Sequence, residues 1–331
     1  MPKVNLVITA WNEVKTTAKI IETVISNYSY ELENLRIILV CPDVETADSA
    51  QKIALELNFD NLTVLKDERK GKPIALNMAF EEIRRQFVTL DNLDQKNTLG
   101  LEDSITICTD GDVVLEPDSI NLVVKKLLEN NYLAVTARPK SIDSKDNFWG
   151  YVGNMLADGA DVRRTQLSEN GDFLFLSGYL LGFQSKVLES ITVPENCLVD
   201  DAFLSIAINN LEFSNTLSSQ KSNTGYCRES VVGVKYPNNY KDWILQKKRS
   251  VGGYRQLKNF FPKQNKLTQS RLWDELKFIL FPLKYAKTET EFFYSLFFYF
   301  LRLDLWIRIF LDNFSKNKSM EQTWQRVEST K

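Results

Sequence analysis

The sequence predicts an α/β protein with a mainly parallel, doubly wound sheet. Apolar runs typical of buried strands alternate, through the first half of the chain, with segments whose apolar residues recur at helical spacing. Because β-α-β alternation places helices on both faces of a sheet, this pattern favours an open α/β fold. In such sheets, ligands bind at the carboxyl ends of the strands.

The first element is a buried strand over residues 4–8, followed by a helix over residues 13–26. A later helix starts at Pro73, a residue that suits the first helical position, and runs to about residue 86. Residues 90–103 are polar and read as a surface excursion. The remaining expected elements are strands over residues 36–41, 62–65, 105–109 and 132–136 and helices over residues 45–57 and 117–129.

The character of the chain changes after residue 266. Residues 272–285 and 291–314 are rich in Phe, Leu, Trp and Tyr, and the longest uncharged run, residues 292–301, has ten residues. That is short of the roughly 18–20 apolar residues that span a bilayer. Charges at residues 304, 308 and 312 would line one helix face. We expect an amphipathic helix that either packs on the body or lies in a membrane interface.

Charge is unevenly distributed along the 331 residues. Residues 231–331 carry 19 Lys and Arg against 9 Asp and Glu, a net charge of +10, and the remainder carries −12. A basic C-terminal part suggests an anionic partner, such as phosphate groups or an anionic membrane surface, although the lysines could simply solvate helices. No feature indicates nucleic-acid binding.

Histidine is absent, which excludes Ser-His-Asp and Cys-His catalysis and imidazole zinc sites. A general base must then be Asp, Glu, Lys, Tyr or Cys. The four cysteines are widely spaced and are expected to be buried structural thiols. The chain opens almost directly into a strand, so we expect a cytoplasmic protein, either free or bound peripherally to the inner face of the cell membrane.

Asp110-Gly111-Asp112 follows the strand expected at residues 105–109. Alternate residues of a strand point to one face, so both carboxylates could reach one ligand, and glycine permits close approach to the backbone. Hard oxygen ligands suit Mg²⁺ or Mn²⁺, which bind through one or two carboxylates together with substrate phosphates. A solvated acidic turn is the alternative interpretation.

Further motifs occur in a fixed order around this D-x-D. They are Thr9-Ala10-Trp11-Asn12-Glu13, Asp43, Gly71-Lys72-Pro73-Ile74-Ala75-Leu76-Asn77, Ser177-Gly178-Tyr179, Asp200-Asp201 and Gln246-Lys247-Lys248-Arg249. Over about the first 255 residues, the set resembles the inverting family 2 nucleotide-sugar glycosyltransferases with the GT-A fold. Two positions depart from the family pattern: Thr9 stands where Pro is usual, and Ser250 stands where the family's Q-x-x-R-W motif has Trp.

The resemblance implies a role for each motif. Asp112 and Asp110 would hold the metal, Asp201 would be the general base with Asp200 beside it, and Arg249 with Gln246 would clamp the departing diphosphate. Asp200-Asp201 could also be a helix N-cap pair, and Asp43 a turn residue. The implied donor-binding residues are Thr9, Ala10, Asn12, Glu13, Asp43, Lys72, Asn77, Asp110, Gly111 and Asp112, and Ser177, Gly178 and Tyr179 would line the acceptor side.

The missing Trp at position 250 argues against processive polymer synthesis, although Trp243 or Tyr254 could replace it. We therefore predict a metal-dependent, inverting transfer of a sugar from a nucleotide-sugar donor, with UDP-linked sugars favoured, to a glycan or lipid-linked acceptor. The expected domains are residues 1–265, with a nucleotide half to residue 120 and an acceptor half from residue 121, and a helical extension over residues 266–331.

The sequence leaves two other functional classes as alternatives. The first is a membrane-peripheral binding or scaffold protein on a catalytically degenerate transferase fold. The second is a nucleotidyltransferase or NAD-type enzyme, which the absence of G-x-G-x-x-G after a strand disfavours.

Overall fold

The computed structural model describes residues 2–91, 101, 104–130, 132–211, 222–264, 279–314 and 328–330. Its chain forms two compact units. Unit 1 comprises residues 1–139, 163–196 and 200–234, and unit 2 comprises residues 140–162, 197–199 and 235–331. The domain boundary expected at residue 265 stays a prediction.

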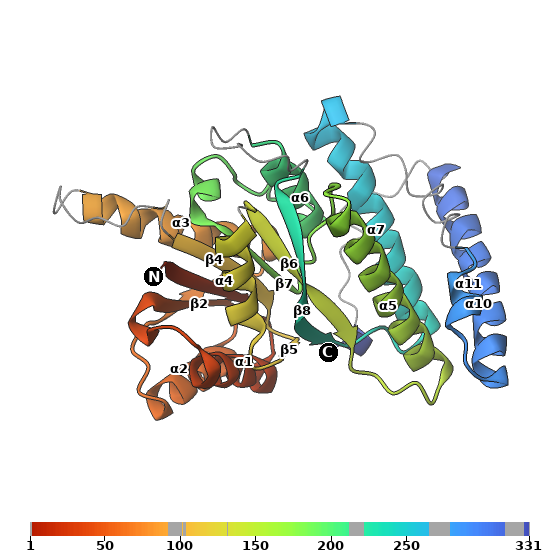
Figure 1. Ribbon diagram of the computed structural model, residues 1–331, viewed down its shortest axis with the longest axis horizontal. Coiled ribbons are helices and arrows are strands. Elements are labelled where there is room, and N and C mark those ends of the chain that lie inside the picture. The colour runs from red at the N-terminus through yellow and green to blue at the C-terminus, as the bar shows by residue number, and fades with distance from the viewer. Residues whose placement is uncertain are drawn as a thin grey trace. The chain divides into compact units, whose positions relative to one another are not determined.

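One eight-stranded sheet has the strand order β3-β2-β1-β4-β7-β6-β8-β5 (Figure 1). Its first four strands are parallel, as predicted: β1 (Lys3–Thr9), β2 (Leu35–Cys41), β3 (Leu62–Lys66) and β4 (Ser104–Asp110). The register aligns Thr9 with Val40 on one side and with Asp110 on the other. The polar residues that end these strands therefore meet at one edge of the sheet.

The other half of the sheet is mixed rather than parallel. Here β7 (Leu180–Gln184) lies between β4 and β6 (Ala134–Ser141) and is antiparallel to both. The short β5 (Val114–Leu115) pairs antiparallel with β8 (Thr224–Val234). A long α5 (Phe148–Glu169) separates β6 from β7, so the chain has room to return in either direction.

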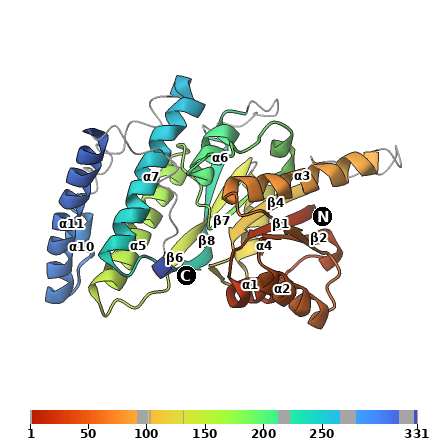
Figure 2. The ribbon, with the colours of Figure 1, turned by 180° about the vertical axis from the view of Figure 1, so that it is seen from behind.

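Helices cover both faces of the sheet. On one face α1 and α2 pack together, and α4 is tied to the end of α1 because Asn121 Nδ2 donates to Asn27 O at 2.8 Å. Figure 2 shows α3 in front of β1 and β2, with α4 behind the sheet. The bounds are α1 (Val14–Asn27), α2 (Val44–Glu56), α3 (Lys72–Asp91), α4 (Ser119–Asn130) and α6 (Asp200–Asn209), with 3-10 turns at Leu32–Asn34, Ser185–Glu189, Pro262–Gln264 and Glu328–Thr330.

Unit 2 has its own aromatic core. Residues Tyr151, Trp243 and Phe298 are at its centre, and Tyr151 Oη lies 2.7 Å from Ser295 Oγ. This core is formed by the first part of α5, α7 (Tyr240–Phe260) and α11 (Glu289–Phe314), and α10 (Phe281–Tyr285) packs partly buried aromatic residues against it. The expected helix at residues 291–314 is thereby confirmed, whereas residues 92–100 and 272–278 lie outside the described part of the chain.

Three faces of α11 have different surroundings. A buried stripe of Ser295, Phe298, Leu305 and Ile309 contributes to the core of unit 2. The charged face expected from the sequence is present, since Arg308 Nε contacts Asp304 Oδ2 at 2.7 Å and Lys248 of α7 pairs with Asp312 at 2.6 Å. The third face, which we call the exposed apolar face, consists of Phe292, Phe293, Leu296, Phe297, Phe300, Leu303, Ile307, Phe310 and Leu311, each 36–68% exposed.

The charged face of α11 thus contributes to packing within unit 2, while its aromatic residues are divided between the core and the surface. Among the helices that the structure describes, none has both the length and the apolar composition needed to cross a bilayer.

Candidate active site

Asp43 joins two loops at the carboxyl edge of the sheet. Its Oδ1 accepts from Thr46 N at 3.0 Å, as the N-cap of α2, and its Oδ2 accepts from Asn12 N at 2.9 Å. Burial would raise the pKa of this carboxyl, but the bonds from Asn12 and Thr46 outweigh burial and lower it. Asp43 therefore has the turn and N-cap role that the sequence offered as an alternative. A contact between Asp43 and a nucleobase stays a prediction, and it would use the lone pairs of the Asp43 carboxylate that Asn12 and Thr46 do not occupy.

The loop after β1 has an unusual backbone. Asn12 has φ 56° and its side chain is exposed, whereas Glu13 is buried, with its N–H donating to Thr46 Oγ1 at 3.2 Å. Across from this loop, the guanidinium of Arg69 lies 5.4 Å from the centre of the Trp11 ring, and Arg69 itself has φ 58°. Left-handed non-glycine residues concentrate at functional loops. Sequence reasoning missed Arg69, whose only signal is the basic run ahead of Gly71.

The D-x-D has a different geometry from the one expected. The strand ends at Asp110, and Gly111 and the half-buried Asp112 lie in the turn beyond it, so strand alternation does not orient the second carboxylate. A Cβ at Gly111 would lie 2.6 Å from Ala10 Cβ and 2.6 Å from Glu13 Oε2. Glycine is thus needed because the loop after β1 packs on the turn, a reason that the sequence did not reveal.

Lys72 forms the ionic centre of unit 1. It is the first residue of α3, and its Nζ lies 2.6 Å from Asp110 Oδ1 and 3.3 Å from Asp200 Oδ2. Burial would lower the pKa of Lys72, but the negative charges of Asp110, Asp200 and Asp201 raise it well above its ordinary 10.5. The ammonium therefore stays charged and joins the D-x-D to the acidic pair.

The segment expected on the acceptor side leads into β7, next to β4. Thr109 Oγ1 donates to Tyr179 O at 2.7 Å, and Ser177 N donates to Thr136 Oγ1 at 2.9 Å. Gly178 N donates to Asp201 Oδ2 at 3.3 Å. The fold thereby brings this segment, the D-x-D strand and Asp201 together, although they are far apart in the sequence.

Asp201 has the character of a tuned carboxyl group. Burial, and then the neighbouring charge of Asp200, raise its pKa above the ordinary 3.8, while Lys72 and bonds from the N–H groups of Ala202 and Gly178 oppose the rise. Asp200 and Asp201 both stand in the first turn of α6. Negative charge at a helix N-terminus is favourable, so a structural and a chemical role are compatible here.

Three expected donor residues have structural partners in unit 1. Asn77 Nδ2 donates to Val193 O at 2.7 Å while its Oδ1 accepts from Val193 N at 3.0 Å, which fixes α3 to the chain after β7. Thr9 Oγ1 donates to Asp110 Oδ1 at 3.4 Å. Ala10 is buried, and its N–H donates to Val40 O. Direct contact of these residues with a donor stays a prediction.

Gln246 and Arg249 lie three residues apart on α7, within unit 2, and their role at the site stays a prediction. The suggestion that Trp243 replaces the missing aromatic is wrong. Trp243 is only 2% exposed and contacts Tyr240, Trp149 and Phe298, so it has no free face for a sugar. Tyr254 is partly exposed.

All four cysteines are buried and free, as predicted. Burial, followed by the charges of Asp43 and Asp67, raises the pKa of Cys41 to about 12, and burial likewise raises the pKa of Cys108 and of Cys227. The thiols of Cys41, Cys108 and Cys227 therefore stay protonated near neutral pH and are poor nucleophiles.

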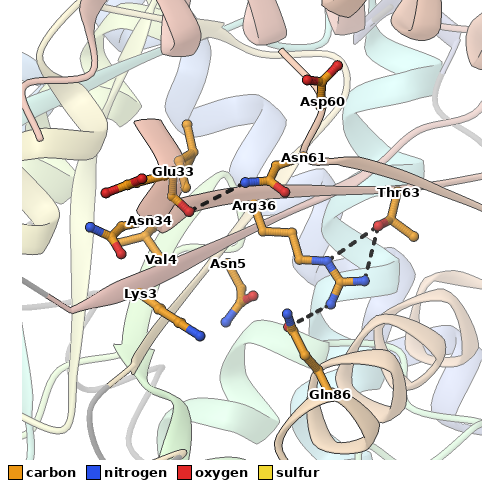
Figure 3. Close-up of a pocket in the computed structure, with 11 residues that line it drawn as sticks. Lys3, Val4, Asn5, Glu33, Asn34, Arg36, Asp60, Asn61, Thr63 and Gln86 are labelled. Carbon is orange, nitrogen blue, oxygen red and sulfur yellow. Dashed lines mark hydrogen bonds between the residues drawn. The ribbon is translucent and has the colours of Figure 1, made fainter. Parts of the chain in front are cut away.

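A polar hollow of about 300 Å³ lies at the opposite edge of the sheet (Figure 3). It begins at the amino ends of β1 and β2, and the guanidinium of Arg36 crosses it to bond Thr63 and Gln86. None of the candidate site residues lines it. The hollow is therefore distinct from the carboxyl-edge site.

Within the described residues, no three acidic or cysteine side chains form a ready-made metal cage. The residues present still fit a hard cation, because Asp110 and Asp112 supply two carboxylates at a strand end and Mg²⁺ or Mn²⁺ completes its shell with phosphate oxygens and water. Such a site would be completed by the substrate rather than preformed.

A family model described as "Glycosyltransferase like family 2" matches residues 2–253. The chain belongs to this family. No protein with a curated functional description matches it significantly. The match covers every motif from Thr9 to Arg249 and excludes the NAD-type alternative.

Solved structures of similar fold have low sequence identity. A mannosyltransferase from Pyrobaculum calidifontis, solved with GDP-Man and Mn²⁺, is 18% identical with a TM-score of 0.53 over 77% of this chain. This chain spans 64% of that protein's length. Glucosyl-3-phosphoglycerate synthase from Mycobacterium tuberculosis is 14% identical with a TM-score of 0.47, over 78% of this chain and 79% of that protein. Mannosyl-3-phosphoglycerate synthase from Rubrobacter xylanophilus is 15% identical with a TM-score of 0.47, over 78% of this chain and 75% of that protein. The first likeness supports the GT-A fold.

Proposed function

We propose that this protein transfers a sugar from a nucleotide-sugar donor to an acceptor hydroxyl with inversion. The observation that carries the proposal is the ionic cluster in unit 1, in which Lys72 joins Asp110 of the D-x-D to Asp200. It unites a strand-end carboxylate suited to a metal-bound diphosphate with the Asp200-Asp201 pair, in which burial and the charge of Asp200 raise the pKa of Asp201.

The proposed reaction is a single displacement. The acceptor oxygen forms a bond to the anomeric carbon while the bond from that carbon to the diphosphate oxygen breaks, and the electron pair leaves with the nucleoside diphosphate. Asp201 takes the proton of the acceptor hydroxyl as that oxygen attacks. Ser177, Gly178 and Tyr179 are the candidates for positioning the acceptor, because Gly178 contacts Asp201 directly.

A divalent cation on Asp112 and Asp110 would neutralise charge on the diphosphate. The Mn²⁺ in the P. calidifontis mannosyltransferase complex supports this choice of metal. Thr9, Asn12, Asp43 and the loop of Gly111 are the candidates for holding the nucleotide. UDP-linked sugars remain our first choice of donor, and GDP-mannose is a required comparison because that same complex contains it.

Donor hydrolysis by the purified protein tests the proposal. Binding of a panel of UDP- and GDP-sugars is measured with and without Mn²⁺, followed by release of the nucleoside diphosphate. We expect metal-dependent binding and slow hydrolysis of at least one donor. Binding without any hydrolysis or transfer would instead favour a scaffold protein on a degenerate transferase fold.

Arg249 and Gln246 are proposed to hold the departing diphosphate, since a guanidinium binds phosphate through two parallel hydrogen bonds. Arg249→Ala should weaken nucleoside-diphosphate binding and slow turnover together. The matched control is Arg255→Ala, which replaces an exposed arginine farther along α7 and should leave nucleoside-diphosphate binding unchanged.

We also propose that unit 2 binds the surface of an anionic membrane, which would favour a lipid-linked acceptor. The exposed apolar face of α11 supports this, because nine apolar side chains share one helix face on a unit rich in Lys and Arg. Full-length protein is floated with anionic and with neutral liposomes at low and high salt. Flotation that requires anionic lipid and weakens with salt is expected, and protein that stays in solution throughout would refute the membrane proposal.

A further inference from the structure

Lys72 occupies the place in unit 1 where the donor side and the base side of the candidate site meet. Its Nζ is 2.6 Å from Asp110 Oδ1 and 3.3 Å from Asp200 Oδ2, and these partners belong to β4 and α6. A Cβ on Gly178 would lie 3.3 Å from the same Nζ, so the acceptor-side segment also closes on it. About a quarter of the Lys72 side chain remains exposed.

The position of Lys72 is unfavourable for a cation in the absence of these carboxylates. It is the first residue of α3, and the amino end of a helix carries partial positive charge. The electrostatic attraction of Asp110 and Asp200 offsets that cost. The ammonium of Lys72 in turn neutralises the Asp110 carboxylate, which a metal ion would need as a ligand. Because the ammonium lies only 2.6 Å from Asp110, it would also strongly repel a divalent cation bound there.

We infer that Lys72 is the resident cation of the donor-free site and that the donor diphosphate draws it from Asp110, so that metal and donor are taken up together. The inference rests on the proposed function for the identity of the donor. The diphosphate supplies new oxygen partners for the ammonium, and the vacated Asp110 carboxylate becomes available to the metal beside Asp112. Metal without nucleotide is then bound weakly, and each ligand raises the affinity for the other by the same factor.

The inference predicts an unusual sign for one substitution. A lysine that serves only to bind phosphate would leave metal binding unchanged when it is removed. A resident cation that competes with the metal instead lowers metal affinity, so its removal should raise Mn²⁺ affinity in the absence of nucleotide. Because the competing charge lies within a few ångströms, the expected gain is about tenfold or more.

The experiment titrates Mn²⁺ calorimetrically into the full chain at pH 8, with and without UDP and, separately, GDP. The variants are Lys72→Gln, Lys72→Met and Lys72→Arg. Lys70→Gln is the matched control, because Lys70 stands two residues away in an exposed pair with Glu68. Thermal unfolding with and without Mn²⁺ verifies that each variant is folded, and Lys72→Met provides a second neutral side chain of similar length.

Tighter Mn²⁺ binding by Lys72→Gln or Lys72→Met without nucleotide, with Lys72→Arg and Lys70→Gln close to wild type, would support the inference. The gain should disappear in the double variant Lys72→Gln/Asp110→Asn, since the metal gained is held by Asp110. Equal or weaker Mn²⁺ binding by folded neutral variants overturns it. The titrations with nucleotide test the proposed function separately: a wild type that binds neither UDP nor GDP with Mn²⁺ contradicts that function, whereas the metal-only comparison still decides the role of Lys72.

Discussion

Unit 1 and unit 2 use charge and apolar surface in opposite ways. Unit 1 has 20 Lys and Arg against 30 Asp and Glu, a net charge of −10, and its central charges are drawn together around Lys72. Unit 2 has 21 against 13, a net charge of +8, and the ion pair of Lys248 with Asp312 joins α7 to α11. Apolar side chains are buried in the sheet of unit 1, whereas α11 exposes a continuous apolar face.

This difference indicates a division of labour. Removing an ionic cluster from water has a cost that the attraction between its opposite charges offsets. Because groups with perturbed pKa values concentrate at functional sites, the cluster around Lys72 gives unit 1 the features of a catalytic site. An exposed apolar face on a basic unit has the features of a surface-binding element. The predictions below test whether each property belongs to its own unit.

The largest effect is expected from Asp112→Ala. Loss of a direct carboxylate ligand should abolish Mn²⁺-dependent binding of the nucleoside diphosphate, a larger loss than the roughly 10–100-fold typical of outer partners. The measurement is calorimetry with UDP and GDP. The control is Asp118→Ala, which changes an exposed residue of the same region and should bind the nucleoside diphosphate normally. Unchanged Mn²⁺-dependent affinity in Asp112→Ala would show that Asp112 is not a metal ligand.

Asp201→Asn should separate binding from chemistry. The amide keeps the shape but cannot accept the proton, so kcat should fall by roughly 10²-fold or more while donor affinity survives. Steady-state kinetics together with donor titration checks this. If transfer persisted at a near-normal rate, the base would be another carboxylate, with Asp200 the first to examine.

Within unit 2, Phe293→Glu and Phe300→Glu should each reduce liposome binding by about tenfold, since burying a Phe side chain is worth about 1.5–3 kcal/mol. Both residues lie on the exposed apolar face of α11. Leu55→Glu, on a leucine of unit 1 that is 74% exposed, should float like the wild type. An equal loss in all three variants would mean that the apolar surface acts without regard to unit.

Two glycines give a smaller contrast in stability. Gly111→Ala should destabilise the protein by about 1–3 kcal/mol, because its Cβ would overlap Ala10 and Glu13. Gly252→Ala on α7, where the nearest atom is 3.9 Å away, should be neutral or stabilising by up to about 1 kcal/mol. Thermal unfolding measures both, and a stable Gly111→Ala would contradict the close packing of the D-x-D turn.

The smallest effect concerns pH. A base must be deprotonated, so kcat should fall as the pH drops through the pKa of Asp201, with a midpoint above 3.8 because burial and Asp200 raise that pKa. Asp200→Asn removes the neighbouring negative charge and should move the midpoint to lower pH. A pH–rate profile that shifts to higher pH in this variant would exclude Asp201 as the titrating group.

The sequence by itself determined the strands of the parallel half and the order of the motifs. Apolar runs that end in polar residues, such as residues 105–109 before Asp110, specify local structure because burial and chain direction act over a few neighbours. The same reasoning indicated that Asp43 would follow a strand and that residues 304, 308 and 312 would share a helix face. The order and spacing of the motifs were then sufficient to indicate the glycosyltransferase family whose family model matches residues 2–253.

Tertiary structure alone decided the rest. The insertion of β7 between β4 and β6, the burial of Trp243 and the exposure of one face of α11 depend on how distant segments pack, which no local pattern encodes. The need for glycine at position 111 arises from a loop a hundred residues earlier. The contact of Lys72 with both Asp110 and Asp200 exists only because three chain segments meet at one edge of the sheet, where opposite charges attract through a partly buried, weakly screened site.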